Sequence, residues 1–147
     1  MVIRRATAAD AGPMAEVWLR SFSAALPTVR RPHGDDDVRA YFRDVLVPQQ
    51  ESWVAVDEGQ VVGLLALDGD FVSQLYIDPA HRRQGIGTRL LDLAKRERPA
   101  GLQLWTFQVN TAAQAFYRHH GFVEVERTDG TGNQEREPDI RFEWHPG

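Results

Sequence analysis

The stretch from Leu75 to Thr88 holds the residues best suited to bind an anion. An apolar run rich in β-forming residues ends at Asp78, and a helical pattern begins near Ile86. The connection carries two arginines and two glycines: Arg82, Arg83, Gly85 and Gly87. A glycine-bearing loop before a helix N-terminus brings together free N–H groups and the positive end of the helix dipole. Arginine adds charged, bidentate donors, so the pattern predicts a phosphate site, although a tight turn with incidental charge would look the same.

Other phosphate-binding loops do not fit these residues. A dinucleotide-binding loop requires a third glycine where Leu90 stands, and a P-loop requires a lysine before the hydroxyl of Thr88. Protein-kinase loops need further motifs that the chain lacks. The absence of cysteine excludes disulfides, thiolate zinc sites and a cysteine nucleophile. No spacing of histidines and acids matches a zinc motif.

Charge is distributed unevenly along the 147 residues, whose net charge is -4. A composition with 42% hydrophobic and 26% charged residues is ordinary for a globular protein, and the net charge argues against a nucleic-acid partner. Residues 57–78 contain acids but no lysine or arginine, whereas residues 81–89 contain arginines but no acid. This pattern favours one anionic ligand, with acidic surroundings that either suit a cationic second ligand or are simply solvated.

No segment of the sequence predicts a membrane partner. The longest apolar stretch, Val61 to Leu67, is far shorter than the roughly 20 residues that span a bilayer. Residues 1–5 lack the apolar core of a signal peptide. We therefore expect a cytoplasmic protein.

Seven strands and four helices are predicted to position the loop. The predicted strands are 2–5, 52–56, 61–67, 71–77, 102–107, 122–127 and 140–144. The predicted helices are 7–26, 35–47, 86 to before Pro99, and 111–120. Thr111 and Gln114 fit a capping box at the start of the last helix, and Gly121 fits its end. The order predicts an α/β (α+β) fold with a mixed sheet, forming a single domain over residues 1–147.

Two motifs in the correct order carry a family resemblance. The first, Arg82-Arg83-Gln84-Gly85-Ile86-Gly87, follows an apolar strand, and the second runs from Asn110 through Phe116-Tyr117 to Gly121-Phe122. With both motifs the chain resembles the GCN5-related N-acetyltransferase (GNAT) family, most strongly over residues 61–127. The resemblance implies the acyl-CoA N-acyltransferase fold: a mixed, mostly antiparallel sheet of about seven strands, flanked by about four helices and splayed between strands 4 and 5.

The resemblance also implies acetyl-CoA as the acyl donor. Main-chain N–H groups of the loop would hold the pyrophosphate: Arg82, Arg83, Gln84, Gly85, Ile86, Gly87 and Thr88. The main chain of Leu75, Tyr76 and Ile77 would pair with the pantetheine arm like an added strand, next to a bulge that opens the slot. Asn110 would lie beside this arm, and it could also cap the helix that starts at Thr111.

The implied reaction is attack of a primary amine on the thioester. Tyr117 would donate a proton to the leaving sulfur, although helical spacing also suits it to core packing. The general base stays open among Asp70, Glu135, Glu137, Asp139, His120 and water. The first two helices and the loops 27–34 and 129–139 would select the acceptor. Trp18, Phe22, Tyr41, Trp53 and Trp105 could line its pocket or belong to the core.

The leading interpretation is an acetyl-CoA-dependent N-acetyltransferase acting on a small-molecule or peptide amine. The alternative is a non-catalytic acyl-CoA sensor on the same fold. A hydrolase finds no support, because the chain lacks a Gly-x-Ser-x-Gly nucleophile motif. No metal is expected, and a homodimer stays open because dimers occur in the family.

Overall fold

The computed structural model describes residues 1–147 and confirms the predicted order of elements. Seven strands form one sheet in the order β1-β2-β3-β4-β5-β7-β6. Their bounds are β1 Val2–Arg5, β2 Glu51–Asp57, β3 Gln60–Asp68, β4 Phe71–Ile77, β5 Leu102–Phe107, β6 Val123–Arg127 and β7 Asp139–Trp144.

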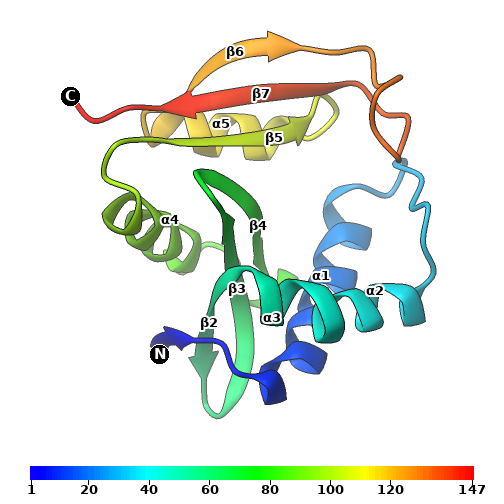
Figure 1. Cartoon of the computed structure of the whole chain (residues 1–147), viewed down its shortest axis with the longest axis vertical. Coiled ribbons are helices and arrows are strands. Elements are labelled where there is room, and N and C mark those ends of the chain that lie inside the picture. The colour runs from blue at the N-terminus through cyan, green and yellow to red at the C-terminus, as the bar shows by residue number, and fades with distance from the viewer.

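The sheet is splayed between β4 and β5, as the resemblance implied. All other neighbouring strands are antiparallel, whereas β4 and β5 are parallel and share one residue pair, Phe71 opposite Gln103. The N–H of Gln103 also donates to the carbonyl of Asp70 at 3.0 Å. Beyond this point the two strands separate, so β1–β4 and β5-β7-β6 form two halves with a gap between them (Figure 1).

Helices cover both faces of the sheet. They are α1 Ala11–Ala25, α2 Asp35–Tyr41, α3 Val47–Gln49, α4 Ile86–Glu97 and α5 Thr111–His119. Strand alternation sends Val54 and Leu64 into a core with α1 and α2, whereas Ala55 and Leu65 enter a second core with α4 and α5. None of these helices has the length and apolar character needed to cross a bilayer.

The second predicted helix differs from a regular α-helix. Residues Phe42–Leu46 form a π-helical turn between α2 and α3. The wider turn buries both Phe42 and Leu46, and it leaves Val45 38% exposed. Simple 3.6-residue periodicity does not reveal the extra residue of such a turn.

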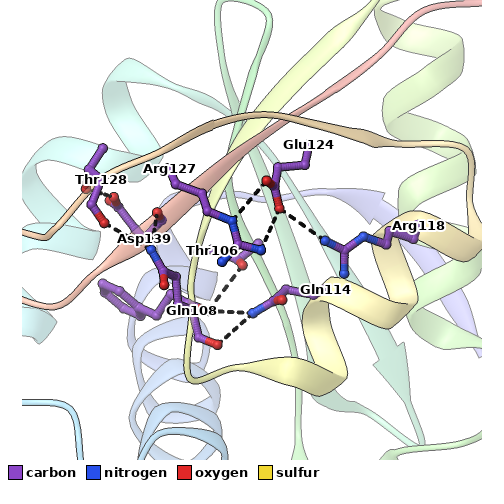
Figure 2. Close-up of polar contacts among 9 residues, drawn as sticks. Thr106, Gln108, Gln114, Arg118, Glu124, Arg127, Thr128 and Asp139 are labelled. Atoms are coloured by element: carbon purple, nitrogen blue, oxygen red, sulfur yellow. Dashed lines mark hydrogen bonds and ion pairs between the residues drawn. The ribbon is translucent and has the colours of Figure 1, made fainter.

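The predicted capping box of α5 is wrong. Asn110 is the N-cap, and its side-chain oxygen accepts a hydrogen bond from the N–H of Ala113 at 3.1 Å. The side chain of Gln114 turns inward and donates to the main-chain carbonyls of Phe107 and Gln108 at 3.2 and 2.9 Å (Figure 2). Gln114 thus ties α5 to the end of β5, and Gly121 ends the helix with φ +89°, as predicted.

We expect Asp10→Asn to lower the free energy of unfolding by about 2 kcal/mol near neutral pH. The buried carboxylate of Asp10 accepts hydrogen bonds from Arg4 at 2.7 and 3.0 Å and from the N–H of Thr7 at 2.7 Å. The hydrogen bonds from Arg4, then those from Thr7, lower its pKa from 3.8 to about 2. Because the folded-state pKa is depressed, this stabilisation is present above pH ~4 and is lost as the pH falls toward 2. Urea unfolding at pH 7 and pH 3 should show the gap to the wild type shrinking; a constant gap would contradict the assignment.

Candidate active site

The gap between β4 and β5 exposes main-chain groups of β4. The N–H of Asp78, just after β4, donates a hydrogen bond to the carbonyl of Val62 on β3 at 2.8 Å. Because pairing alternates along an antiparallel ladder, Tyr76 also turns its main chain toward β3, whereas Leu75 and Ile77 turn theirs toward the gap. The carbonyl of Ile77 already accepts a hydrogen bond from the hydroxyl of Ser21 on α1 at 2.7 Å. The gap is therefore lined by both main-chain groups of Leu75 and by the N–H of Ile77.

A β-bulge lies where β4 leaves β5. The register against β3 shifts between Ala66 and Leu67, which leaves Ser73 as the extra residue of β4. The hydroxyl of Ser73 lies 3.2 Å from the carbonyl of Ala66 and 2.5 Å from Oε1 of Gln50. The bulge thus sits two residues before the stretch 75–77 and helps to open the gap.

The loop after β4 is anchored at its start and left-handed near its end. The carboxylate of Asp78 accepts from the N–H of Ala80 at 3.0 Å and from the guanidinium of Arg20 at 2.6 and 3.0 Å. Arg83 and Gly85 have φ +63° and +77°, a conformation that glycine adopts without strain. Gly85 is the N-cap of α4 and has no protein atom within 4 Å of an added Cβ. The first N–H groups of α4 are thus directed at an open position, the arrangement that binds phosphate.

Side chains of the loop point in different directions. Those of Arg82, Arg83 and Gln84 are exposed, whereas Ile86 is buried in the core under α4. The hydroxyl of Thr88 lies 3.2 Å from Nε2 of His120, on the side facing α5. The loop therefore presents main-chain N–H groups together with the exposed arginine side chains, and Arg82 lines the first cavity described next.

A cavity of about 350 Å³, here the first cavity, lies along β4 between the loop and α5. Its lining includes seven predicted site residues: Leu75, Tyr76, Ile77, Arg82, Gly87, Asn110 and Tyr117. It also includes five residues that were not among the predicted site residues: Ser21, Ala25, Ala112, Ala113 and Phe116. A hydroxyl on the apolar face of the first predicted helix was the available signal for Ser21.

A second cavity of about 300 Å³ continues from the first into the gap between β4 and β5. The two cavities share Leu75, Tyr76, Asn110, Ala113 and Tyr117. The far side of the second cavity is formed by Asn133, Glu135 and Asp139 from the loop before β7 and its first residue. A molecule in the first cavity and a molecule in the second would therefore meet beside Tyr117.

Tyr117 is a buried residue at this junction. Its ring packs edge-on against Phe116 and Phe122, with centroid distances of 5.3 and 5.5 Å. Burial raises the pKa of the phenol above its ordinary value, and the nearby Tyr76 raises this pKa further. The phenol therefore stays protonated across the pH range of ordinary assays, which suits it to donate a proton while its ring belongs to the core.

Asn110 lies between the two cavities. Its side-chain oxygen caps α5, whereas its amide NH2 makes no hydrogen bond to another protein group. The two roles expected for this residue are thus compatible, because they use different atoms of one side chain.

The structure separates most candidates for the general base from the junction. Asp70 accepts from Gln103 at 3.1 Å near the start of β5 and lines neither cavity, and Glu137 also lines neither. His120 faces α4, and burial, then the charges of His119 and Lys95, lowers its pKa.

Asp139 and Glu135 both line the second cavity. The carboxylate of Asp139 accepts hydrogen bonds from Thr128 and Asn133, and Figure 2 shows it held beside β6. Glu135 has no such partner. Glu135 shares the lining of the second cavity with Tyr76 and Tyr117. Burial and then the charge of Glu135 raise the pKa of Tyr76 to about 12.

Of the five aromatic residues considered for an acceptor pocket, four line cavities. A third cavity of about 150 Å³, between α1, α2 and residues 134–135, contains Trp18, Phe22 and Tyr41. Trp105 lines the second cavity, whereas Trp53 is buried in the core. Glu135 lines both the second and third cavities, so they adjoin at its side chain.

Comparison with known proteins identifies relatives with this architecture. A family model for the acetyltransferase (GNAT) domain matches residues 48–124. Peptidyl-lysine N-acetyltransferase YjaB of Salmonella typhimurium is 31% identical over 131 residues, covering 86% of each protein. Peptidyl-lysine N-acetyltransferase YiaC of Escherichia coli is 27% identical over 126 residues, covering 85% of each.

Solved structures show the same fold. The solution structure of apo YjaB from Escherichia coli superposes with a TM-score of 0.80 at 27% identity, covering 98% of each chain. The crystal structure of the PaiA N-acetyltransferase of Thermoplasma acidophilum in complex with coenzyme A has a TM-score of 0.74 at 18% identity. This superposition covers 99% of the present chain and 98% of the PaiA chain.

Proposed function

Because this chain belongs to the GNAT acetyltransferase family and is an acetyl-CoA-dependent N-acetyltransferase, we propose that its acceptor is the side-chain amine of a peptide or protein lysine. The observation that carries the proposal is the pair of adjoining cavities that meet at Tyr117, with the carboxylate of Glu135 on the acceptor side. Two relatives that match most of this chain are named for peptidyl-lysine acetylation, which supports the same acceptor class.

The residues that line the first cavity have the donors and acceptors that acetyl-CoA would need there. The free N–H groups at the start of α4 would hold the pyrophosphate, since Gly85 opens the approach. Leu75 and Ile77 would pair through their main chains with the pantetheine amides, and the NH2 of Asn110 would donate to this arm. An N–H of β4 in the gap would face the thioester oxygen as negative charge develops.

The reaction requires two proton transfers, and we assign them to Glu135 and Tyr117. Acetyl-CoA supplies an acyl carbon open to attack by a neutral amine, but a lysine amine has a pKa of about 10.4 and arrives protonated. Glu135 would take one proton from the ammonium, directly or through water. As the C–N bond forms and the C–S bond breaks, Tyr117 would protonate the departing sulfur and recover a proton from the amide nitrogen.

The alternative of a non-catalytic sensor is not retained, because the curated relatives are named for N-acetyl transfer. That residues 1–147 form one GNAT domain remains a proposal. A cytoplasmic location and the absence of a nucleic-acid partner stay predictions from the sequence, and a homodimer stays open.

Thiol release from acetyl-CoA with a panel of amines tests the acceptor class. The panel should include lysine peptides, free amino acids, a short alkylamine and an acidic amine, with an amine-free reaction as control. We expect amine-dependent release that is fastest with lysine peptides, and mass spectrometry should place the acetyl group on the lysine side chain. Fast turnover of small amines with no acetylation of any lysine peptide would contradict the proposal.

Glu135→Gln should lower kcat/KM for a lysine peptide about 100-fold near pH 7. Without a base, the reaction depends on the fraction of free amine, which rises about tenfold per pH unit below pH ~10.4. The rate of the variant should therefore climb toward that of the wild type as the pH rises. Glu137→Gln is the matched control, because Glu137 lines neither cavity. Parallel pH profiles for Glu135→Gln and the wild type would remove Glu135 as the base.

A further inference from the structure

Arg31, in the loop between α1 and α2, carries a buried donor that the fold does not use. Its Nη2 pairs with the carboxylate of Asp35 at 2.5 Å. Its Nη1 is shielded from solvent and has no hydrogen-bond partner. Buried polar groups in proteins are almost always hydrogen-bonded, and an unmade bond at a charged group is costly. The fold therefore leaves one donor of Arg31 unpaired, while the side chain as a whole stays 27% exposed.

Arg31 lines the third cavity. The other walls are aromatic or polar, with Trp18 and Tyr41 on the helices and Glu135 on the opposite loop. Because Glu135 also lines the second cavity, the two cavities adjoin at its side chain, which would give the acceptor a path from Arg31 to the junction at Tyr117. A lysine ammonium between Glu135 and Tyr117 would place its four-carbon stem along this path.

Two loops meet above the third cavity. Nε2 of His33 lies 3.2 Å from Oε1 of Gln134, although these residues are far apart in the sequence. Figure 1 shows the loop before α2 touching the loop between β6 and β7. Arg31 and Glu135 come from these two loops and both line the third cavity, so both could contact the same acceptor.

We propose that Arg31 is a specificity-determining residue that binds an oxygen of the acceptor next to the reactive amine. The inference rests on the proposed function and deepens it. In a peptide, the oxygen is the main-chain carbonyl of the lysine or its neighbour; in a free amino acid, it would be the carboxylate. Glu135 would bind the cation at one end of the acceptor, and Arg31 would bind the oxygen at the other. An amine without that oxygen would therefore lack the contact with Arg31.

Three acceptors separate the sources of the oxygen. Nα-acetyl-lysine methylamide offers only carbonyls, Nα-acetyl-lysine adds a carboxylate, and butylamine offers no oxygen. With Arg31→Met, which keeps an unbranched stem, we expect kcat/KM for the methylamide to fall roughly 10-fold to 100-fold. The value for butylamine should stay within about twofold. A loss confined to the carboxylate-bearing acceptor would also support the subsite, with carboxylate as its ligand.

Two further variants guard against a purely structural role. Asp35→Asn removes the partner of Nη2 but keeps the guanidinium, and it should leave the preference for the methylamide over butylamine unchanged. Arg31→Lys keeps the charge without the forked donors and should fall between Arg31→Met and the wild type. Thermal unfolding of each variant reports on folding.

Failure of the Arg31 subsite and failure of the proposed lysine acetylation would give different results. Equal losses for all three acceptors, or no loss for any, would overturn the subsite while leaving lysine acetylation intact. A wild-type enzyme that acetylates butylamine but neither lysine derivative would overturn the proposed function, and this inference with it.

Discussion

Tyr117→Phe is expected to lower kcat by about 100-fold to 1,000-fold while the dissociation constant of acetyl-CoA changes little. The substitution keeps the ring that packs against Phe116 and Phe122 and removes only the hydroxyl at the junction of the two cavities. A thiol with a pKa of about 8.5 is a fair leaving group even without a proton, which limits the loss to the lower part of the range for general acids.

Two measurements check this prediction. Calorimetric titration with coenzyme A separates binding from turnover, and thermal unfolding confirms that the core is intact. The pH profile adds a test, because the raised pKa of Tyr117 keeps its proton in place. We expect no loss of wild-type kcat between pH ~8 and ~10 from titration of this phenol.

Tyr76→Phe serves as the comparison. Tyr76 lines the same two cavities, and the charge of Glu135, on the acceptor side, helps to raise the pKa of its phenol. If Tyr76→Phe lost more activity than Tyr117→Phe, the proton donor would be Tyr76. Unchanged turnover in Tyr117→Phe would remove the proposed role of this residue altogether.

The strands and the loop before α4 could be predicted from the sequence because their signals are local. The apolar runs fix the strands through their own alternation, and a left-handed position such as Gly85 favours a residue without a Cβ. The splay between β4 and β5 came from the family resemblance, since no local pattern indicates where a sheet divides.

The parts that could not be predicted depend on contacts between distant segments. In the sequence Glu135 is one of several acidic candidates for the base, and only the fold shows that it lines the same cavity as Tyr76, about sixty residues earlier in the chain. The hydroxyl of Ser21 on an apolar helix face was a weak signal, and only the fold shows that it donates to the carbonyl of Ile77. At Asn110, two rules competed: Thr111 and Gln114 fit a capping box, but the preceding asparagine was the better N-cap.

Gly87→Glu is expected to weaken acetyl-CoA binding at least 100-fold. Gly87 lies in the first turn of α4 and lines the first cavity, where a Cβ would come 3.4 Å from the ring of Phe116 and 3.8 Å from Ile77. A carboxylate extending from this position would occupy the space beside the free N–H groups and repel the pyrophosphate. Like charges forced together cost several kcal/mol, and about 1.4 kcal/mol corresponds to each tenfold change in affinity.

Gly87→Ala is the matched control, because it adds the methyl group without the charge and should weaken binding only a few-fold. The stability of Gly87→Glu makes the test sharper. A carboxylate in the first turn of a helix interacts favourably with the helix dipole, so the variant should unfold at the same temperature as Gly87→Ala or higher. Lost binding in a protein that is no less stable would locate the phosphates at the start of α4. Normal affinity for acetyl-CoA in the folded glutamate variant would show that the diphosphate lies somewhere else.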